Sequence, residues 1–140
     1  MHDRLERLKK MMHSGNFTCV IETANEVFTS VQRGVKPLLE FLDSGKDFRD
    51  AYASDKVIGK AAAFIYVKLG ISKLYTDVIS EPALEILTAY SVDVEYGELV
   101  KVIRNRVGDG FCPMETAVWS INDPDKAIAT MKIRLAELSK

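Results

Sequence analysis

The chain has 140 residues and a mass of 15.7 kDa, which suits one domain and is too short for two. Its apolar fraction of 47% and charged fraction of 28% are ordinary for a globular protein and exclude the disordered and fibrous classes. A formal charge of −1 argues against a basic surface that would grip nucleic acid or membrane, so we expect neither partner.

The sequence pattern also lacks targeting signals and a disulfide framework. The charged start of the chain, as far as Lys10, has no apolar core of a secretory signal. The apolar run from Ala61 to Val67 is much shorter than the ~20 residues of a membrane span. Two cysteines are too few for a disulfide scaffold. We therefore expect a cytoplasmic protein with a single domain over residues 1–140.

The chain begins with an amphipathic helix, predicted over residues 1–15. Leu5, Leu8 and Met12 share one face of this helix, and charged residues surround them. Phe17 to Glu22 and Glu26 to Val31 are rich in Val, Ile, Phe and Thr, which predicts two strands. Because only three residues connect these strands, we expect an antiparallel hairpin.

Three further segments follow before the middle of the chain. Val35 to Leu42 has apolar residues at helical spacing and predicts a short helix. Lys46 to Asp55 is polar and charged, which favours a surface loop or a short irregular strand. Lys60 to Leu69 is apolar nearly all round, so we expect a central helix that packs on more than one side.

The next segments predict a strand, a helix and a second strand. Lys73 to Ile79 is apolar on both faces, as in an interior strand. Glu81 to Tyr90 predicts a helix that Ser80 caps at its N-terminus. Val92 to Tyr96 alternates apolar and acidic residues, as in a strand with one face in water, and Glu98 to Ile103 fits either a strand or a helix.

Two helices end the chain and complete the predicted fold. One begins at Cys112 and runs to about Ile121, and Asp123 caps the last one. The strand, helix and strand from Lys73 to Tyr96 predict a right-handed parallel crossover. Together these elements predict an α/β fold. We expect three α/β/α layers and a mixed sheet made of the N-terminal antiparallel hairpin plus parallel strands.

This order of elements resembles the cytidine-deaminase-like fold. Three segments point to a narrower resemblance. Their order and spacing are similar to those in an uncharacterised family of small bacterial and archaeal proteins placed in that superfamily. The segments are Asp55 to Ala61, Ser80-Glu81, and Asn105 to Glu115. The resemblance covers most of the chain from Phe17 onward, and it implies a deaminase-type pocket that the corresponding helix starts line.

The resemblance does not extend to the zinc motifs. Zinc deaminases begin the central helix with a His-Ala-Glu or Cys-Ala-Glu triplet and the next helix with Pro-Cys-x-x-Cys. The matching stretches here are Lys60-Ala61-Ala62 and Pro82 to Ile86, which hold no zinc ligand. His2 and His13 are roughly 16 Å apart along a helix, too far to share an ion. We therefore predict no metal site and no cofactor.

Lys60, Cys112 and Glu115 are the candidate catalytic residues. Lys60 follows Gly59 at a helix start, where backbone N–H groups and the ammonium would hold an anion. The alternative is a lysine that reaches solvent from a buried helix end. Cys112 is either a nucleophilic thiol at a helix start or a small buried residue. Glu115 or Asp55 would act as the acid or base.

Five further residues are candidate ligand contacts: Asp55, Ser80, Glu81, Asn105 and Arg106. The basic loop Arg104 to Gly110 suits recognition of phosphate or carboxylate, and it equally fits a solvated turn. Ser80-Glu81 is first a helix cap and only second a site. That these residues meet around one pocket is what the resemblance implies.

Two functions follow as expectations. The first is binding of an anionic, nucleotide-like small molecule in a zinc-free deaminase-type pocket, with or without catalysis by Cys112, Lys60 and Glu115. The alternative is a non-catalytic interaction or regulatory module that forms a homo-oligomer. In that case, the apolar face of the N-terminal helix would dock on another subunit.

Overall fold

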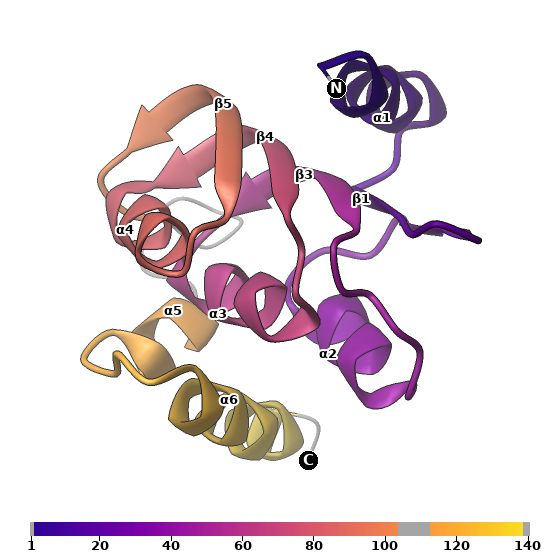
Figure 1. The fold of residues 1–140 in the computed structure, drawn as a ribbon. Helices are drawn as coiled ribbons and strands as arrows, with labels where there is room; N and C mark the ends of the chain where they lie inside the picture. Colours follow the sequence, from indigo (N-terminus) through magenta and orange to yellow (C-terminus); the bar gives the residue numbers. More distant parts are fainter. Residues whose placement is uncertain (1, 104–112, 139–140) are drawn as a thin grey trace.

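The computed structural model describes the backbone of residues 2–103 and 113–138, and side chains from residue 4 onward within these ranges (Figure 1). This part of the chain forms six helices and five strands. The helices are α1 (His2–Gly15), α2 (Lys36–Asp43), α3 (Lys60–Leu69), α4 (Glu81–Ala89), α5 (Pro113–Val118) and α6 (Pro124–Leu138). The strands are β1 (Cys19–Glu22), β2 (Val27–Ser30), β3 (Tyr52–Ile58), β4 (Lys73–Ser80) and β5 (Asp93–Val100).

The five strands form one mixed sheet in the order β2-β1-β3-β4-β5. β1 is antiparallel to both β2 and β3, whereas β3, β4 and β5 are parallel to one another. The predicted hairpin and the predicted parallel crossover through α4 are therefore both confirmed. The α/β fold class with a mixed sheet is confirmed as well.

The main correction concerns Lys46 to Asp55, which was expected to form a surface loop or a short irregular strand. It contributes most of β3, which lies in the middle of the sheet between β1 and β4. Ala53, Ser54 and Asp55 are all buried, although two of them are polar. Their polar groups have partners inside the protein, since Ser54 contacts the Met12 sulfur and Asp55 bonds to Tyr66. A polar sequence can therefore occupy a central strand here.

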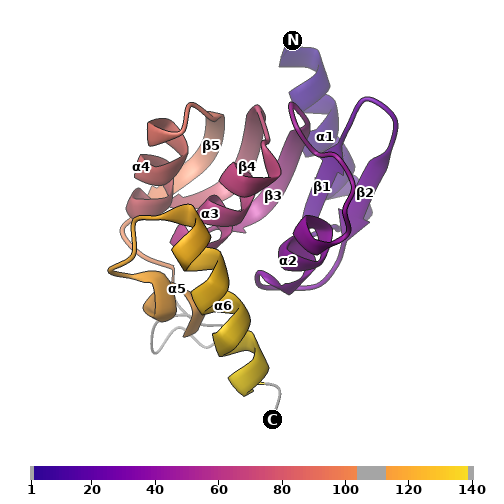
Figure 2. The same ribbon diagram turned by 60° about the horizontal axis from the view of Figure 1, so that its bottom comes forward.

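Helices cover both faces of the sheet (Figures 1 and 2). α1 covers one face, where Leu5, Leu8 and Met12 pack with Val20 and Tyr75. α2, α3 and α4 cover the other face, and α5 and α6 pack on α3 from outside. The central helix α3 is thus enclosed on more than one side, as predicted. The apolar face of α1 is covered by the chain's own sheet.

The three parallel strands share a distortion at one level of the sheet. Lys56, Asp77 and Gly97 interrupt the regular pairing of β3, β4 and β5. Ala53 and Ile58 are five residues apart, yet both belong to the core on the α3 side. Residues five apart in a regular strand face opposite sides, so the strand shifts its phase by one residue. This phase shift immediately follows Asp55.

Candidate functional site

The start of α3 is closed by a carboxylate from another helix. Gly59 precedes α3 in an extended conformation and offers no side-chain cap. Glu115 of α5 supplies the cap instead, since its oxygens accept the backbone N–H groups of Lys60 at 2.8 Å and Ala61 at 2.7 Å. Burial raises the pKa of Glu115, and these two N–H groups oppose that rise. The anion expected at this helix start is therefore part of the chain itself.

The Lys60 side chain points away from the helix start. Its ammonium donates to the Trp119 carbonyl oxygen at 2.8 Å and lies 3.5 Å from Asn122 Oδ1. The residue is only 6% exposed, and burial lowers the pKa of its amine. Lys60 thus ties α3 to the connection between α5 and α6, which accounts for a lysine at an otherwise unfavourable helix N-terminus.

A cavity of about 790 Å³ lies beside this helix start. Its wall is built from the end of β3, the first turn of α3, the beginning of α5 and the segment 31–38, which leads from β2 into α2. Ile103 and Pro113 also line it. The volume lies in the range of small-molecule sites, roughly 300–1,000 Å³. We refer to this cavity as the α3 pocket.

Asp55 is the buried acid of the α3 pocket. The Tyr66 hydroxyl donates to its Oδ2 at 2.6 Å, and the Val57 backbone N–H donates to its Oδ1 at 3.2 Å. Burial raises the pKa of Asp55 to about 7, although these hydrogen bonds oppose the rise. Cys19 is its cross-strand neighbour, and burial together with the Asp55 charge raises the pKa of that thiol. A carboxyl with a pKa near neutrality beside a cavity is a candidate acid or base.

Two cationic residues, Arg33 and Lys56, also line the α3 pocket. Arg33 is exposed, and the Lys56 ammonium donates to Asn16 Oδ1 at 2.9 Å. Neither was among the residues predicted for the site. Arg33 lies in a connection with no motif, and Lys56 lies in the segment whose strand was not recognised. Only the packing of segment 31–38 against the end of β3 brings them to one wall.

The predicted site residues fall into three groups. Asp55 and Glu115 share the wall of the α3 pocket, whereas Lys60, Ser80 and Glu81 are not among its lining residues. Ser80 is buried and caps α4 by accepting the Ala83 N–H at 3.2 Å. Glu81 is exposed in the first turn of that helix. The third group, Asn105, Arg106 and Cys112, lies outside the described residues, as does the rest of the predicted basic loop.

Metal ligands do not gather in the described part of the chain. Among residues 4–103 and 113–138, no group of three or more His, Cys, Asp or Glu side chains could hold an ion. None of the described helices has the length and apolar character needed to cross a membrane.

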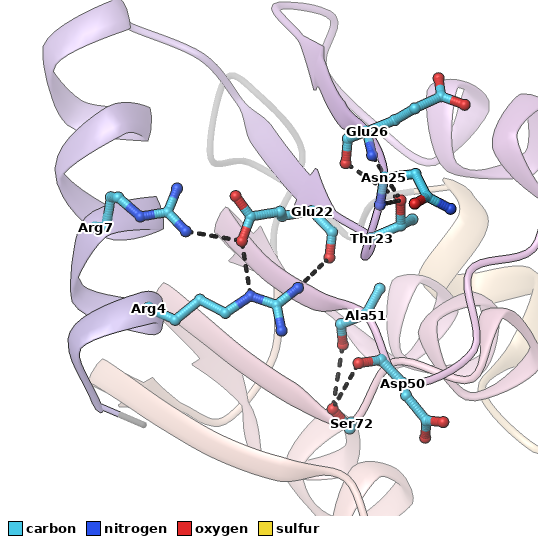
Figure 3. Close-up of polar contacts among 9 residues, drawn as sticks. All are labelled: Arg4, Arg7, Glu22, Thr23, Asn25, Glu26, Asp50, Ala51 and Ser72. Carbon is cyan, nitrogen blue, oxygen red and sulfur yellow. Dashed lines mark hydrogen bonds and ion pairs between the residues drawn. The ribbon is translucent and has the colours of Figure 1, made fainter.

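A second hollow, of about 470 Å³, is lined by Arg4 of α1 and by the β1–β2 hairpin. Figure 3 shows the polar contacts of its residues. Its charged residues are already paired. Arg4 Nε and Arg7 donate to the same Glu22 oxygen at 2.7 and 2.8 Å, and Arg4 also donates to the Glu22 carbonyl oxygen at 3.0 Å. The Arg4 guanidinium lies 4.1 Å from the centre of the Tyr52 ring. This cluster anchors α1 on the sheet rather than forming a second site.

Comparisons with known proteins identify the family. Residues 7–135 match the family model described as TM1506, a domain of unknown function (DUF1893). A crystal structure of a DUF1893 family protein (TM1506) from Thermotoga maritima is similar, with a TM-score of 0.87 and 26% sequence identity. The match covers 98% of this chain and 91% of that chain. No curated protein matches. The chain belongs to the DUF1893 family of domains of unknown function.

Proposed function

We propose that this protein binds an anionic, nucleotide-like small molecule in the α3 pocket. The observation that carries the proposal is the lining of a cavity of about 790 Å³ by two cationic residues, Arg33 and Lys56. Cavities of this size enclose small molecules, and a guanidinium suits phosphate and carboxylate groups because it donates two parallel hydrogen bonds. Arg33 is exposed and so remains accessible to an incoming anion.

The position of the ligand's anionic group follows from the capping of α3. Glu115 already accepts the N–H groups of Lys60 and Ala61, and its carboxylate would repel a second anion there. Lys60 is not among the lining residues of the pocket, and its ammonium donates to the Trp119 carbonyl oxygen. We therefore propose that Arg33 and Lys56 contact the anion. Lys60 and Glu115 position the wall of the pocket.

We also propose that the pocket is of the zinc-free, cytidine-deaminase-like type. In support, an antiparallel hairpin precedes the parallel strands, and the pocket adjoins the start of the central helix. The stretch Lys60-Ala61-Ala62 stands where the zinc deaminases carry a metal ligand and a glutamate. Asp55 has the burial and pKa of an acid or base, so a reaction here would use its carboxyl. The nucleophilic role proposed for Cys112 rests on the sequence alone.

The oligomerising module is the weaker alternative. It depended on the apolar face of α1 being available for another subunit. Leu5, Leu8 and Met12 are at most 4% exposed and pack on the chain's own sheet. We therefore do not propose α1 as an interface.

Isothermal titration calorimetry tests the binding proposal. The probes are inorganic phosphate, citrate, ribose 5-phosphate and the four ribonucleoside monophosphates. At least one phosphate compound should bind, and Arg33→Ala should weaken it at least tenfold. Arg49→Ala is the matched control, because Arg49 is exposed and pairs only with Asp47 among the described residues. Binding that is absent, or equal in wild type and Arg33→Ala, contradicts the proposal.

A further inference from the structure

Asp55 lines the α3 pocket, and its carboxyl group forms no ion pair with residues 4–103 or 113–138. The residue is 8% exposed. Neither neighbouring lysine is paired with Asp55: the Lys56 ammonium donates to the exposed Asn16, and the Lys60 ammonium donates to the Trp119 carbonyl oxygen. The Asp55 carboxyl accepts hydrogen bonds from the Tyr66 hydroxyl and the Val57 backbone, and hydrogen bonding by the Lys56 backbone also lowers its pKa.

This arrangement leaves the charge of an ionised Asp55 without a counter-charge among the described residues. An ionised carboxylate that is buried without a counter-charge is unfavourable, and a cationic neighbour removes the penalty. Because Asp55 borders a cavity, a bound molecule can supply the cationic partner that the described residues do not provide.

We propose that the ligand of the α3 pocket is dipolar, with its anionic group at Arg33 and Lys56 and a protonated nitrogen at Asp55. The nitrogen belongs to an ammonium or amidinium group, which pairs with a carboxylate through charge-assisted hydrogen bonds. This inference rests on the proposed function for the anionic end and adds the class of group at the other end. One ligand thereby satisfies the cationic and the acidic residues of the pocket wall.

The titration of Asp55 gives the proposal a second readout. The titratable and charged groups around it are Cys19 on β1, Tyr66 on α3 and Asp77 on β4, with Arg33, Lys56 and Glu115 on the pocket wall. Burial raises the pKa values of Cys19 and Tyr66, so both stay neutral near pH 7. Burial also raises the pKa of Asp55 to about 7, so binding of a cation should release a proton there. The affinity for a dipolar ligand should therefore increase as the pH rises through 7.

Matched pairs of small probes test the inference. Aminoalkyl phosphates with two, three and four methylene groups are titrated beside alkyl phosphates of the same length and the corresponding alkylammonium ions. In the wild type, at least one aminoalkyl phosphate should bind at least tenfold more tightly than its alkyl counterpart. In Asp55→Asn, which keeps the size of the side chain and an oxygen acceptor, that ratio should fall to about one. Arg33→Ala should weaken both members of a pair equally.

The outcomes separate this inference from the proposed function. If the wild type binds each aminoalkyl phosphate no more tightly than the alkyl phosphate of the same length, the dipolar ligand is overturned and anion binding remains intact. If alkylammonium ions bind, Asp55→Asn abolishes that binding and no phosphate compound binds, the cation contact at Asp55 is supported and the anion contact is refuted. Failure of all probes overturns both. Because the wild-type ratio and its pH dependence suffice, the test does not depend on the stability of the variant.

Discussion

The carboxylate of Glu115 occupies the space that a Cβ atom on Gly59 would need. A Cβ built on Gly59 would lie 2.5 Å from both Cδ and Oε1 of Glu115. The φ angle of Gly59 is −98°, which any residue adopts, so the position requires a small residue rather than an unusual backbone. The close approach lets a side chain from α5 cap α3.

Gly59→Ala should therefore destabilise the protein through crowding with Glu115. We expect the free energy of unfolding to fall by about 1–3 kcal/mol, the usual range for overpacking. The second variant, Glu115→Ala, removes the carboxylate. When Gly59→Ala is added to Glu115→Ala, it should lower the free energy of unfolding much less than it does in the wild type. Urea denaturation of the two single variants and the double variant measures this coupling. Additive effects would show that the two residues do not interact.

Asp55 should make the protein less stable as the pH rises. Its pKa is about 7 in the folded chain against an ordinary value of 3.8, so folding is favoured most while the carboxyl is protonated. Stability should fall between about pH 4 and 7, by at most ~4 kcal/mol from this group. Asp55→Asn should flatten the profile, whereas Asp125→Asn, at an exposed aspartate on α6, should not. Parallel profiles for wild type and Asp55→Asn would refute the prediction.

Lys60→Met should lower stability without changing ligand affinity. Removing the ammonium leaves the Trp119 carbonyl oxygen without this donor, which costs about 1–3 kcal/mol. Lys68→Met on the same helix is the control, because Lys68 pairs with Asp125 at the surface and should contribute below ~1 kcal/mol. Denaturation curves and phosphate titrations of both variants provide the measurement. A weaker phosphate affinity in Lys60→Met would return this residue to the ligand site.

Glu22→Gln should loosen α1 from the sheet. The side-chain hydrogen bond from Arg7, together with Arg4, lowers the pKa of Glu22, so its stabilising effect holds at neutral pH. We expect a loss of about 1 kcal/mol near pH 7 that disappears as acid protonates the wild-type carboxyl. Hydrogen exchange of α1 amides should report it, with Glu26→Gln as the exposed control on the same hairpin. Unchanged exchange in α1 would mean that the cluster shown in Figure 3 contributes little.

Cys19 should be unreactive in the folded protein. It is 3% exposed, and burial is the main reason why the pKa of its thiol is raised, with Asp55 adding to the effect. In Cys112→Ala, where Cys19 is the remaining thiol, iodoacetamide should react only after unfolding in urea. The reverse variant, Cys19→Ala, reports the reactivity of Cys112. Equally slow reaction of both thiols in the folded chain would remove Cys112 as a nucleophile.

Most helices and the hairpin could be predicted because their signals are local. Apolar spacing marks α1 and α2, and Ser80 and Asp123 mark the starts of α4 and α6. β3 could not be predicted in this way, because Ser54 and Asp55 are buried through contacts with α1 and α3. The phase shift after Asp55 also breaks the alternation that reveals a strand.

The sequence by itself determined the fold class, the absence of the zinc deaminase motifs and two residues of the candidate site, Asp55 and Glu115. Only the tertiary structure decided what those residues do. It placed the Glu115 carboxylate on α3, turned the Lys60 ammonium toward α5 and brought Arg33 and Lys56 to the same pocket. The physical reason is that hydrogen bonds, burial and pocket walls join residues far apart in the chain, and spacing along the sequence carries no record of those contacts.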